Sequence, residues 1–433
     1  MQRCLRTTDL DEVGDDRHLT VFQMLGSWSL GDYDGPQSLR WGWELLTDRL
    51  GIGRDRLHAT VFGGDEQMGP DLASWQTWTE LGVPVERLGP DNWWSNGPAG
   101  PCGPDSELFA WTGDDPPQGT PGTDGRWMEL WNHVTMSYRR HHDRSLELLP
   151  QRSVDTGMGV ERLLMAVQGQ PSVFDCDVFQ PWTTALTGLW QPDQRSLRLL
   201  TDHLRSSIVI IGDGVTPSNT GRGYVLRRLL RRALTVLWRP DSSRTLDDLP
   251  TSLVEQTLTQ FGQHEESRPV REVLRGEEHR FAGLLARGRK VLAQLGPGQP
   301  LTETDLRYLH QTHGLPPELV TELLDQPHAH DLTVPEGLPT RRRTLPRSTC
   351  CSDTSALASA STQPQQSRNT ANTITRRKSP ACHAIAATRC RGRARPRITG
   401  ARRRAIPCVL PWVLPWVLPC AGPCGQHPGR GPR

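Results

Sequence analysis

Residues 153–162, SVDTGMGVER, constrain the fold of this chain more than any other segment. Before them, the apolar residues of 146–149 predict a short strand, and after them those of 163–167 recur at helical spacing. The segment therefore predicts a strand that turns directly into a helix. Gly157 and Gly159 lie at this junction, where they allow a tight turn and a close approach of the backbone to a ligand. A glycine-rich turn with an exposed arginine is the alternative.

Two charged side chains flank these glycines. Arg162 falls in the first helical turn, and its planar guanidinium offers five donors in a geometry that suits a phosphate. Asp155 falls at the end of the strand, where its carboxylate can hold an ammonium group. The junction therefore predicts a site that can bind a phosphate and an amine.

A second segment with possible phosphate chemistry is 17–33, RHLTVFQMLGSWSLGDY, which predicts two β segments around Gly26. Arg17 stands at the start of this pair. From there an arginine can reach an α-phosphate and neutralise the charge that develops during transfer. An ordinary β-hairpin without a ligand is the alternative.

The two segments resemble motif 2 and motif 3 of the class II aminoacyl-tRNA synthetases, in the form found in alanyl-tRNA synthetases. The motif 2 pattern of that family is RHHTFFEMLGNFSFGDY, and the positions at which this chain departs from it include Leu19, Gln23, Ser27 and Trp28. The resemblance extends from Gln2 to about Leu323. It implies an α+β fold in which residues 1–190 form a mixed, mainly antiparallel sheet flanked by helices. Residues 195–330 would then form an all-helical domain that binds the acceptor stem of a tRNA.

The resemblance also implies roles for residues of the first domain. It makes Arg17 and Arg162 the catalytic residues, and they would bind ATP together with Met24, Glu107, Gly157 and Gly159. It places Asp155 at the α-amino group of alanine and Trp131 beside the alanine side chain. A pocket discriminates a methyl group weakly, by ~1–3 kcal/mol. Alanine enzymes therefore edit their errors, usually in a separate domain.

Two of these residues can also be judged from their surroundings. Glu107 falls in 91–108, a stretch dense in Gly and Pro that predicts a loop on the sheet. A role near ATP or magnesium and a solvated surface acid are the two alternatives for this residue. Trp131 falls in 127–138, which alternates as a strand does. One face of that strand would carry Met128, Leu130, Val134, Met136 and Tyr138, and the other Glu129, Trp131, His133 and Thr135. A tryptophan among polar residues predicts a pocket wall.

The clearest helix covers 222–238, where leucines form one stripe and the opposite face carries Arg227, Arg228, Arg231 and Arg232. A basic stripe on an otherwise acidic body predicts contact with phosphates, and a solvated surface is the alternative. The resemblance implies that this region binds the acceptor stem of a tRNA and reads its G·U pair. The tRNA-binding residues that it implies are Asn219, Arg227, Arg228, Arg231 and Glu318.

Composition divides the chain near residue 341. Residues 341–433 hold 18 of the 50 Lys and Arg, one of the 48 Asp and Glu, and seven of the ten Cys. This basic Arg/Pro/Cys-rich segment lacks periodicity and predicts a disordered tail, with an RNA-binding tail and an out-of-frame C-terminus as alternatives. The three scattered cysteines of the remainder predict a reduced, cytoplasmic protein. No signal peptide or membrane-spanning segment is recognisable.

The function expected from the resemblance is the activation of alanine by ATP with Mg²⁺, followed by its transfer to the 3′ end of a tRNA. A paralogue that loads a small amino acid on another acceptor and an inactive RNA-binding paralogue are the alternatives. The family's motif 1 has no counterpart before Gln2, and its editing and C-terminal domains have none after about Asp331. We therefore expect a ligase that is truncated at both ends; its oligomeric state is open, with a monomer favoured. We expect no zinc, because the editing domain and its zinc-type motifs are missing and 91–108 keeps one cysteine.

Overall fold

The computed structural model describes residues 1–264, 266–294, 301–313, 315 and 320. All of them lie in the first of two compact units, which covers residues 1–361. The predicted tail, 341–433, and Glu318 lie outside the described residues. Within the described part, one hydrophobic core joins the strands to their helices and a second joins the helices that follow.

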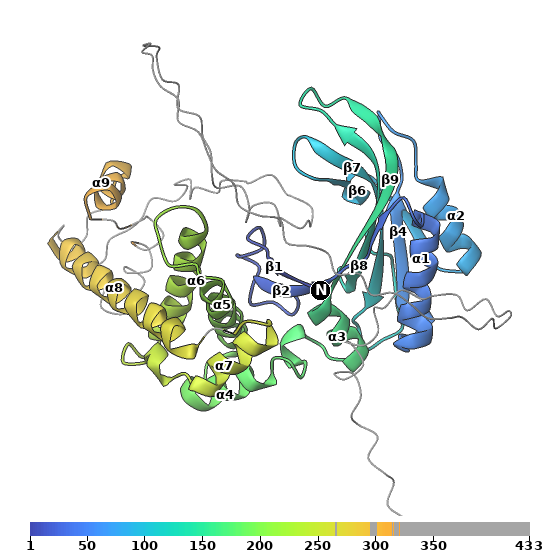
Figure 1. Cartoon of the computed structure of the whole chain (residues 1–433). Helices are drawn as coiled ribbons and strands as arrows, with labels where there is room; N and C mark the ends of the chain where they lie inside the picture. The colour runs from blue at the N-terminus through green and yellow to red at the C-terminus, as the bar shows by residue number, and fades with distance from the viewer. Residues whose placement is uncertain (265, 295–300, 314, 316–319, 321–433) are drawn as a thin grey trace, which may run out of the picture. The chain divides into compact units, whose positions relative to one another are not determined.

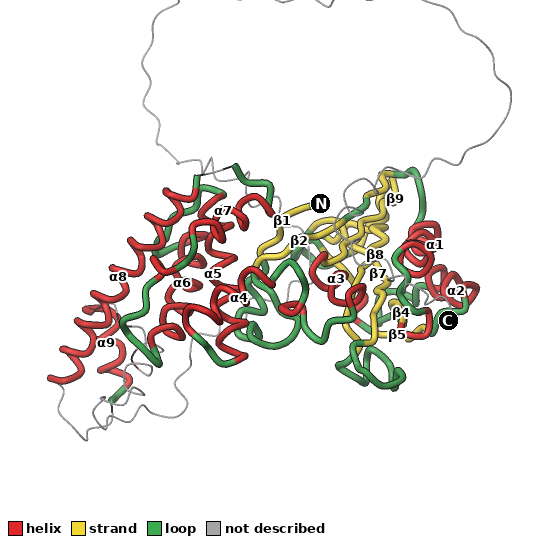
Figure 2. The backbone as a smooth tube through the Cα atoms, turned by 90° about the horizontal axis from the view of Figure 1, so that it is seen from below, coloured by secondary structure: helices red, strands yellow, loops and turns green. Residues whose placement is uncertain are grey.

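A nine-stranded sheet is built from the first part of the chain (Figures 1 and 2). Its main path follows the order β1-β2-β9-β8-β7-β4-β5, with β3 paired to β9 and β6 to β7. The strands are β1 Gln2–Leu5, β2 Val21–Leu25, β3 Trp28–Leu30, β4 Leu57–Phe62, β5 Val85–Leu88, β6 Trp93–Ser95, β7 Gly100–Trp111, β8 Trp127–Arg140 and β9 Leu146–Gly159. Only β4 and β5 pair in parallel among these strands, which confirms the mixed, mainly antiparallel sheet.

Two helices, α1 Gly35–Glu44 and α2 Leu72–Leu81, lie against one face of the sheet (Figure 1). At the start of α1 the side chain of Asp34 accepts a hydrogen bond from the backbone N–H of Gln37, at 2.9 Å. Three apolar residues at helical spacing in α1 and the turn after it are buried against the sheet, namely Leu39, Trp43 and Leu46. The cavities described below lie on the opposite face.

The strand β9 passes directly into the helix α3 Val160–Gln168, which confirms the predicted junction. The tight-turn role predicted for its glycines is not needed, because Gly157 lies within the strand and Gly159 has an ordinary φ of −67°. Close approach is the property that matters at Gly157. A Cβ atom there would lie 2.8 Å from the sulfur of Met24.

The segment around Gly26 contains the two predicted β segments, β2 and β3, but they do not form a hairpin with each other. Both pair with β9, and β3 places Trp28 opposite Asp155. The edge strand formed by β2 and β3 is interrupted at Gly26 and Ser27, where the backbone N–H of Thr156 donates to the carbonyl of Ser27 at 3.0 Å. A Cβ on Gly26 would lie 2.8 Å from the carbonyl oxygen of Thr156, so the close approach of β9 requires glycine. The β-hairpin given as the alternative therefore does not form.

The prediction of a loop over 91–108 is also wrong. This stretch contains β6 and most of β7, a strand that pairs with both β8 and β4. Pro104 fits because the register between β7 and β8 shifts between Cys102 and Asp105, where the ladder is interrupted. A Cβ on Gly103 would overlap the carbonyl of Thr135, so this glycine lets the two strands approach at the bulge.

The helices that follow form the second core. They are α4 Gln180–Trp190, α5 Gln194–Gly212, α6 Gly221–Trp238, α7 Thr251–Gln260, α8 Ser267–Gln294 and α9 Glu303–His313. The predicted leucine stripe of α6 is fully buried. Trp182 and Trp190 of α4 pack into this core, so it begins before the boundary predicted at residue 190. In the described part of the chain, no helix combines the length and the apolar character that crossing a membrane requires.

Candidate functional site

Two adjoining cavities lie at β2, β8 and β9. The first is an open hollow of about 490 Å³, the solvent at its mouth included, and it is lined by both arginines singled out in the sequence, Arg17 and Arg162. The second, of similar volume, is lined by Asp155. Three residues line both cavities and join them, namely Met24, Glu129 and Gly157. The structure thus brings together side chains from segments that lie far apart in the chain.

Arg17 is held from two sides. Its Nε donates to Oδ1 of Asp16 at 2.9 Å, and its Nη1 donates to the carbonyl oxygen of Gly125 at 2.8 Å. The backbone N–H groups of Arg17 and His18 both donate to Oδ1 of Asp15. Burial acts to raise the pKa of Asp15, but the hydrogen bonds from His18 and Arg17 prevail and lower it to about 2. The guanidinium of Arg17 is therefore fixed at the cavity before a ligand arrives.

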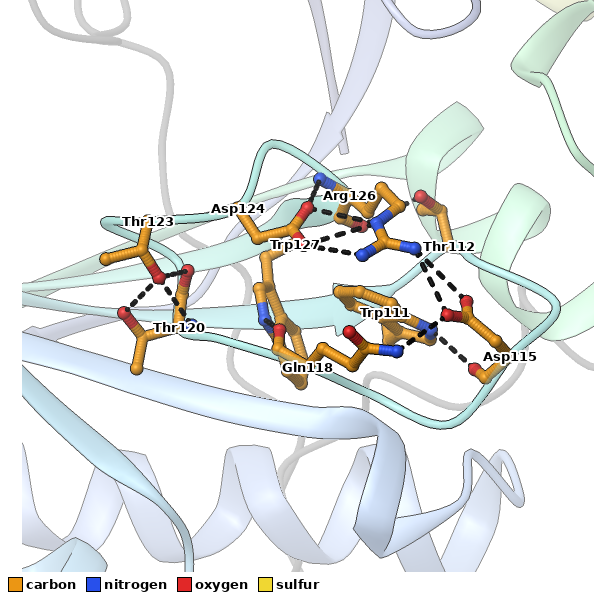
Figure 3. A network of polar contacts seen from close by, with 9 residues as sticks. All are labelled: Trp111, Thr112, Asp115, Gln118, Thr120, Thr123, Asp124, Arg126 and Trp127. Carbon is orange, nitrogen blue, oxygen red and sulfur yellow. Dashed lines mark hydrogen bonds and ion pairs between the residues drawn. The ribbon is translucent and has the colours of Figure 1, made fainter.

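The carbonyl of Gly125 belongs to the loop 112–126 between β7 and β8, which is tied to itself by polar contacts (Figure 3). The guanidinium of Arg126 pairs with the carboxylates of Asp115 and Asp124, and it lies over the indole ring of Trp111. The guanidinium carbon stands 4.3 Å from the ring centre, a distance typical of a cation–π contact. The loop therefore supports Arg17 as a fixed element.

Arg162 lies in the first turn of α3. Its Nη1 donates both to the backbone carbonyl and to the carboxylate of Glu129, at 3.1 Å each. Only 18% of the Arg162 side chain is exposed. Because Glu129 lines both cavities, one carboxylate faces the guanidinium where a phosphate would have to bind. The sequence placed Glu129 on a polar strand face but assigned it no role.

Asp155 stands in a mainly apolar part of the second cavity. Its neighbours across the sheet are Trp28 on β3 and Val134 on β8. Burial raises the pKa of the Asp155 carboxyl, and a hydrogen bond from the Trp28 side chain opposes that rise. One carboxylate between an indole and an isopropyl group suits a small molecule that carries an ammonium group.

The structure does not bring Trp131 to this cavity. Trp131 pairs with Met158 and Val134 with Asp155, in an unbroken register. Side chains alternate between faces along a strand and cross-strand partners share a face. Trp131 and Asp155 therefore point to opposite sides of the sheet. The indole of Trp131 is 9% exposed and packs in the core beside Gly42 of α1, so it does not form the predicted wall.

The face of β8 that carries Trp131 and His133, for which the sequence predicts a pocket wall, is covered by α1. His133 is buried there, with its Nδ1 3.0 Å from the hydroxyl of Ser38, and burial lowers its pKa to about 3. The alternation of this strand is broken where its register with β7 shifts between Leu108 and Phe109. That irregularity separates Glu129, which lines the cavities, from Trp131, which does not. Periodicity alone cannot reveal such a shift.

Two acids of β7 lie behind the cavities. Glu107 accepts a hydrogen bond from Nδ2 of Asn132 at 3.1 Å, and Asp105 accepts one from Nδ2 of Asn92 at 2.9 Å. Burial, together with Glu129 and Asp105, raises the pKa of Glu107 well above its usual range. Burial likewise raises the pKa of Asp105 to about 7. Glu107 lines neither cavity, so Asn132 and Glu129 stand nearer to a ligand than it does.

Magnesium binding was expected near these acids. In the described part of the chain, no three His, Cys, Asp or Glu side chains converge in a preformed metal site. Mg²⁺ commonly binds one or two carboxylates together with the phosphates of a substrate. Glu129, which lines both cavities, fits a cation that enters with a nucleotide.

A buried ion pair connects the site to the helical core. Arg205 of α5 is fully buried, and its Nη2 donates to Oε1 of Glu161 at 3.0 Å. Its Nη1 donates to the carbonyl of Val21 on β2, and Glu161 also accepts from the backbone N–H of Gln23. One helix thereby fixes β2 and α3, the elements that carry Met24 and Arg162. The sequence alone gives Arg205 no role, since its partner Glu161 is far along the chain.

The arginines of α6 are paired within the protein. The Nε atoms of Arg227 and Arg231 lie 3.2 and 2.9 Å from Oε1 of Glu277, a residue of α8 that is fully buried. Arg280 contacts the other oxygen of the same carboxylate, at 3.2 Å. Part of the predicted phosphate-binding stripe therefore holds two helices together.

The rest of the stripe faces the N-terminal segment. Arg228 and Arg232 each lie 3.3 Å from Oδ1 of Asp11. Asn219 is exposed just before α6, and its side-chain oxygen accepts a hydrogen bond from Arg227. Of the predicted tRNA contacts that the structure describes, Asn219 and Arg228 are thus the most accessible.

Comparison with known proteins gives a consistent result. Residues 1–345 match the family model of the tRNA synthetases class II (A). Proteins described as alanine–tRNA ligase from Rubrobacter xylanophilus and Borrelia hermsii are each 37% identical over 356 and 348 residues, and one from Treponema pallidum is 36% identical over 353. These matches cover 74–75% of this chain but 40%, 58% and 58% of the relatives, so the chain spans about half of their length. A solved apo histidyl-tRNA synthetase from S. aureus aligns with a TM-score of 0.24 at 15% identity, over 40% of this chain and 51% of that chain.

Proposed function

The chain belongs to the class II tRNA synthetases (A), and we propose that it activates alanine with ATP and transfers the alanyl group to the 3′ end of a tRNA. The observation that carries this proposal is the shared cavity of Arg17 and Arg162, which is continuous with the cavity of Asp155. A nucleotide and a small amino acid could lie side by side there, which is the arrangement that adenylate formation requires.

The proposed reaction has two steps. A carboxylate oxygen of alanine attacks the α-phosphorus of ATP, and the bond to pyrophosphate breaks. A ribose hydroxyl at the 3′ end of the tRNA then attacks the carbonyl carbon of the alanyl adenylate, and AMP leaves as that hydroxyl gives up its proton. Both steps gather negative charge on phosphate oxygens, which preorganised guanidinium groups stabilise.

The proposed roles follow from position. Arg17 and Arg162 would neutralise the phosphates, while Met24, Gly157 and Gly159 would let the nucleotide approach the backbone closely. Asp155 would hold the ammonium group of alanine. Mg²⁺, when bound, neutralises phosphate charge, and Glu129, with Glu107 behind it, would hold it. Positioning and electrostatics supply the remaining rate enhancement, so no general base is required.

The acceptor stem of the tRNA is proposed to bind at α6. Asn219 and Arg228 are exposed there, and Arg227 and Arg231 add positive charge that exceeds the single charge of Glu277. Glu318, which lies outside the described residues, stays a predicted contact with the stem. We place the reaction in the cytoplasm, in keeping with the free thiols of Cys4, Cys102 and Cys176.

ATP–pyrophosphate exchange tests the first step. Exchange should require alanine, and charging of an alanine tRNA should be lost when the G·U pair of its acceptor stem is replaced. Exchange without charging would indicate an acceptor other than tRNA. RNA binding without exchange would indicate an inactive paralogue, and either result would contradict the proposal.

A further inference from the structure

The wall that closes the second cavity beside Asp155 is the indole of Trp28. Trp28 and Asp155 are direct partners in the pairing of β3 with β9, so their side chains share one face of the sheet. Both line the second cavity, and the Trp28 side chain lies within reach of the Asp155 carboxyl, whose pKa it acts to lower. The indole therefore touches the group that would hold the substrate's amine.

The position of this ring depends on Gly26. A Cβ atom on Gly26 would lie 2.9 and 3.0 Å from Cζ2 and Cη2 of Trp28, closer than ordinary contacts allow. The absence of a side chain thus lets the ring fold back over the interruption between β2 and β3. Half of Trp28 remains exposed, so the ring separates the cavity from solvent and is not a core side chain.

The other side chains do not restrict the cavity in the same way. Trp131 points into the core on the opposite face of the sheet. Val134 contributes a smaller apolar surface on β8, and Gly157 contributes none beyond the backbone. Trp28 is therefore the large ring that limits the space next to Asp155 within the described lining of this cavity.

We propose that Trp28 positions Asp155 and sets the size limit of the amino-acid pocket. Its N–H orients the carboxylate toward an ammonium group, and its ring excludes side chains larger than a methyl group. This inference rests on the proposed function, because it assumes that the second cavity receives an amino acid.

Two substitutions separate these roles. Trp28→Phe keeps an aromatic wall and removes the N–H, so the Kd and KM for alanine should rise about tenfold, since a hydrogen bond to a charged group is lost. The kcat and the KM for ATP should stay within about twofold. Trp28→Ala also opens the wall, and the preference for alanine over 2-aminobutyrate should fall by about tenfold or more, the order of magnitude that one methylene commands.

The pH dependence of alanine binding gives a second readout that a purely structural role would not change. Losing the hydrogen bond from Trp28 raises the pKa of Asp155 further, so the acid limb of binding should move to higher pH in Trp28→Phe. Glu129 is the other ionisable side chain that lines this cavity, and it is unchanged in the variant.

Trp41→Phe is the matched control. Trp41 is 41% exposed on α1, where its ring contacts Tyr33, and it lines neither cavity. Alanine, glycine, serine and 2-aminobutyrate should be titrated by calorimetry with the full chain, beside the exchange assay. An unchanged Kd for alanine in Trp28→Phe, or unchanged selectivity in Trp28→Ala, would overturn the inference. Binding of alanine without exchange would overturn the proposed function alone, and binding of none of these amino acids to the unsubstituted protein would overturn both.

Discussion

Buried acids behind the cavities and in the helical region are neutralised in opposite ways. Asp105 and Glu107 face the amides of asparagines, and burial raises the pKa of both carboxyls. Glu277 in α8 is equally buried, but its carboxylate pairs with the guanidinium groups of Arg227, Arg231 and Arg280. Around Glu277 the helical region therefore uses three guanidinium groups to stabilise its own fold, while Arg228 stays exposed.

The region of the cavities keeps its basic groups at a surface that a ligand can reach. Arg17 is held by Asp16 and a backbone carbonyl, and Arg162 by Glu129, and both line the first cavity. An arginine on the polar face of an element is therefore only a candidate for phosphate binding. A phosphate can bind such an arginine where the arginine and its acid partner lie at a cavity. It cannot do so where the acid is buried among guanidinium groups.

Removal of a guanidinium at the cavity should give the largest effect. Arg162→Ala should lower kcat/KM for alanine-dependent exchange by about 10²–10³-fold, because a preorganised charge that faces the developing phosphate charge is lost. Arg231→Ala, which removes a similar group from the helical region, should leave exchange within about twofold at 25 °C. Circular dichroism would verify that both variants are folded. Equal losses of exchange in Arg162→Ala and Arg231→Ala would contradict the proposed difference between the arginines of the cavity and those of the helical region.

Removal of the buried acid of the helical region should affect stability. Glu277→Gln leaves the neighbouring guanidinium groups without their anion, and the free energy of unfolding should fall by about 2–4 kcal/mol. Glu272→Gln on the same helix is the matched control, because the pair of Glu272 with Arg268 is exposed and should contribute less than about 0.5 kcal/mol. Urea denaturation measures both. A small loss in Glu277→Gln would mean that the arginines are not held by this acid.

Replacement of the acid behind the cavities should stabilise the protein at high pH. The pKa of Asp105 is about 7 in the folded protein, against about 3.9 for an unperturbed aspartate. The folded state therefore keeps a proton that the unfolded chain releases, and stability is lost as pH rises from about 4 to about 7. Asp105→Asn should raise the free energy of unfolding at pH 8 by ~1–2 kcal/mol and have less effect near pH 4.

Urea denaturation at pH 4.5, 6 and 8 checks this prediction. A difference between Asp105→Asn and the unsubstituted protein that did not grow with pH would show that Asp105 is already ionised when folded. The unpaired Oδ2 of Asp105 and Oδ1 of Asn92 are consistent with a proton on the carboxyl, since that proton would supply a donor where both atoms are acceptors.

Local patterns predicted the elements whose residues contact mainly their own helix or strand neighbours. The leucine stripe of α6, the buried stripe of α1 and the passage from β9 into α3 all follow from spacing along one element. The errors at Gly26 and over 91–108 have one cause. Glycine and proline suggested turns, but these segments pair with β9 and β8, which lie far along the chain and were not visible to a local pattern.

The residues of the candidate site also differ in whether neighbours along the chain or distant contacts give them their role. Arg17, Met24, Asp155, Gly157 and Arg162 were recognised from their segments, and the structure gathers them at two joined cavities. Trp131 was misplaced because a shift of register changes the face on which a strand residue lies. Glu129, Trp28 and the Arg205–Glu161 pair could not be assigned from sequence, since each gains its role from a partner on another element.

The amino-acid order by itself determined the apolar stripes of α1 and α6, the strand-to-helix junction and the charged groups available for binding a phosphate and an amine, because these depend on neighbours within a few residues. Only the tertiary structure decided which arginines face a cavity and which are bound by buried acids. It also decided that Trp28, and not Trp131, stands beside Asp155. The physical reason is that burial and pairing in a sheet are set by strands distant in sequence, and those contacts determine both the face of a side chain and the charge that surrounds it.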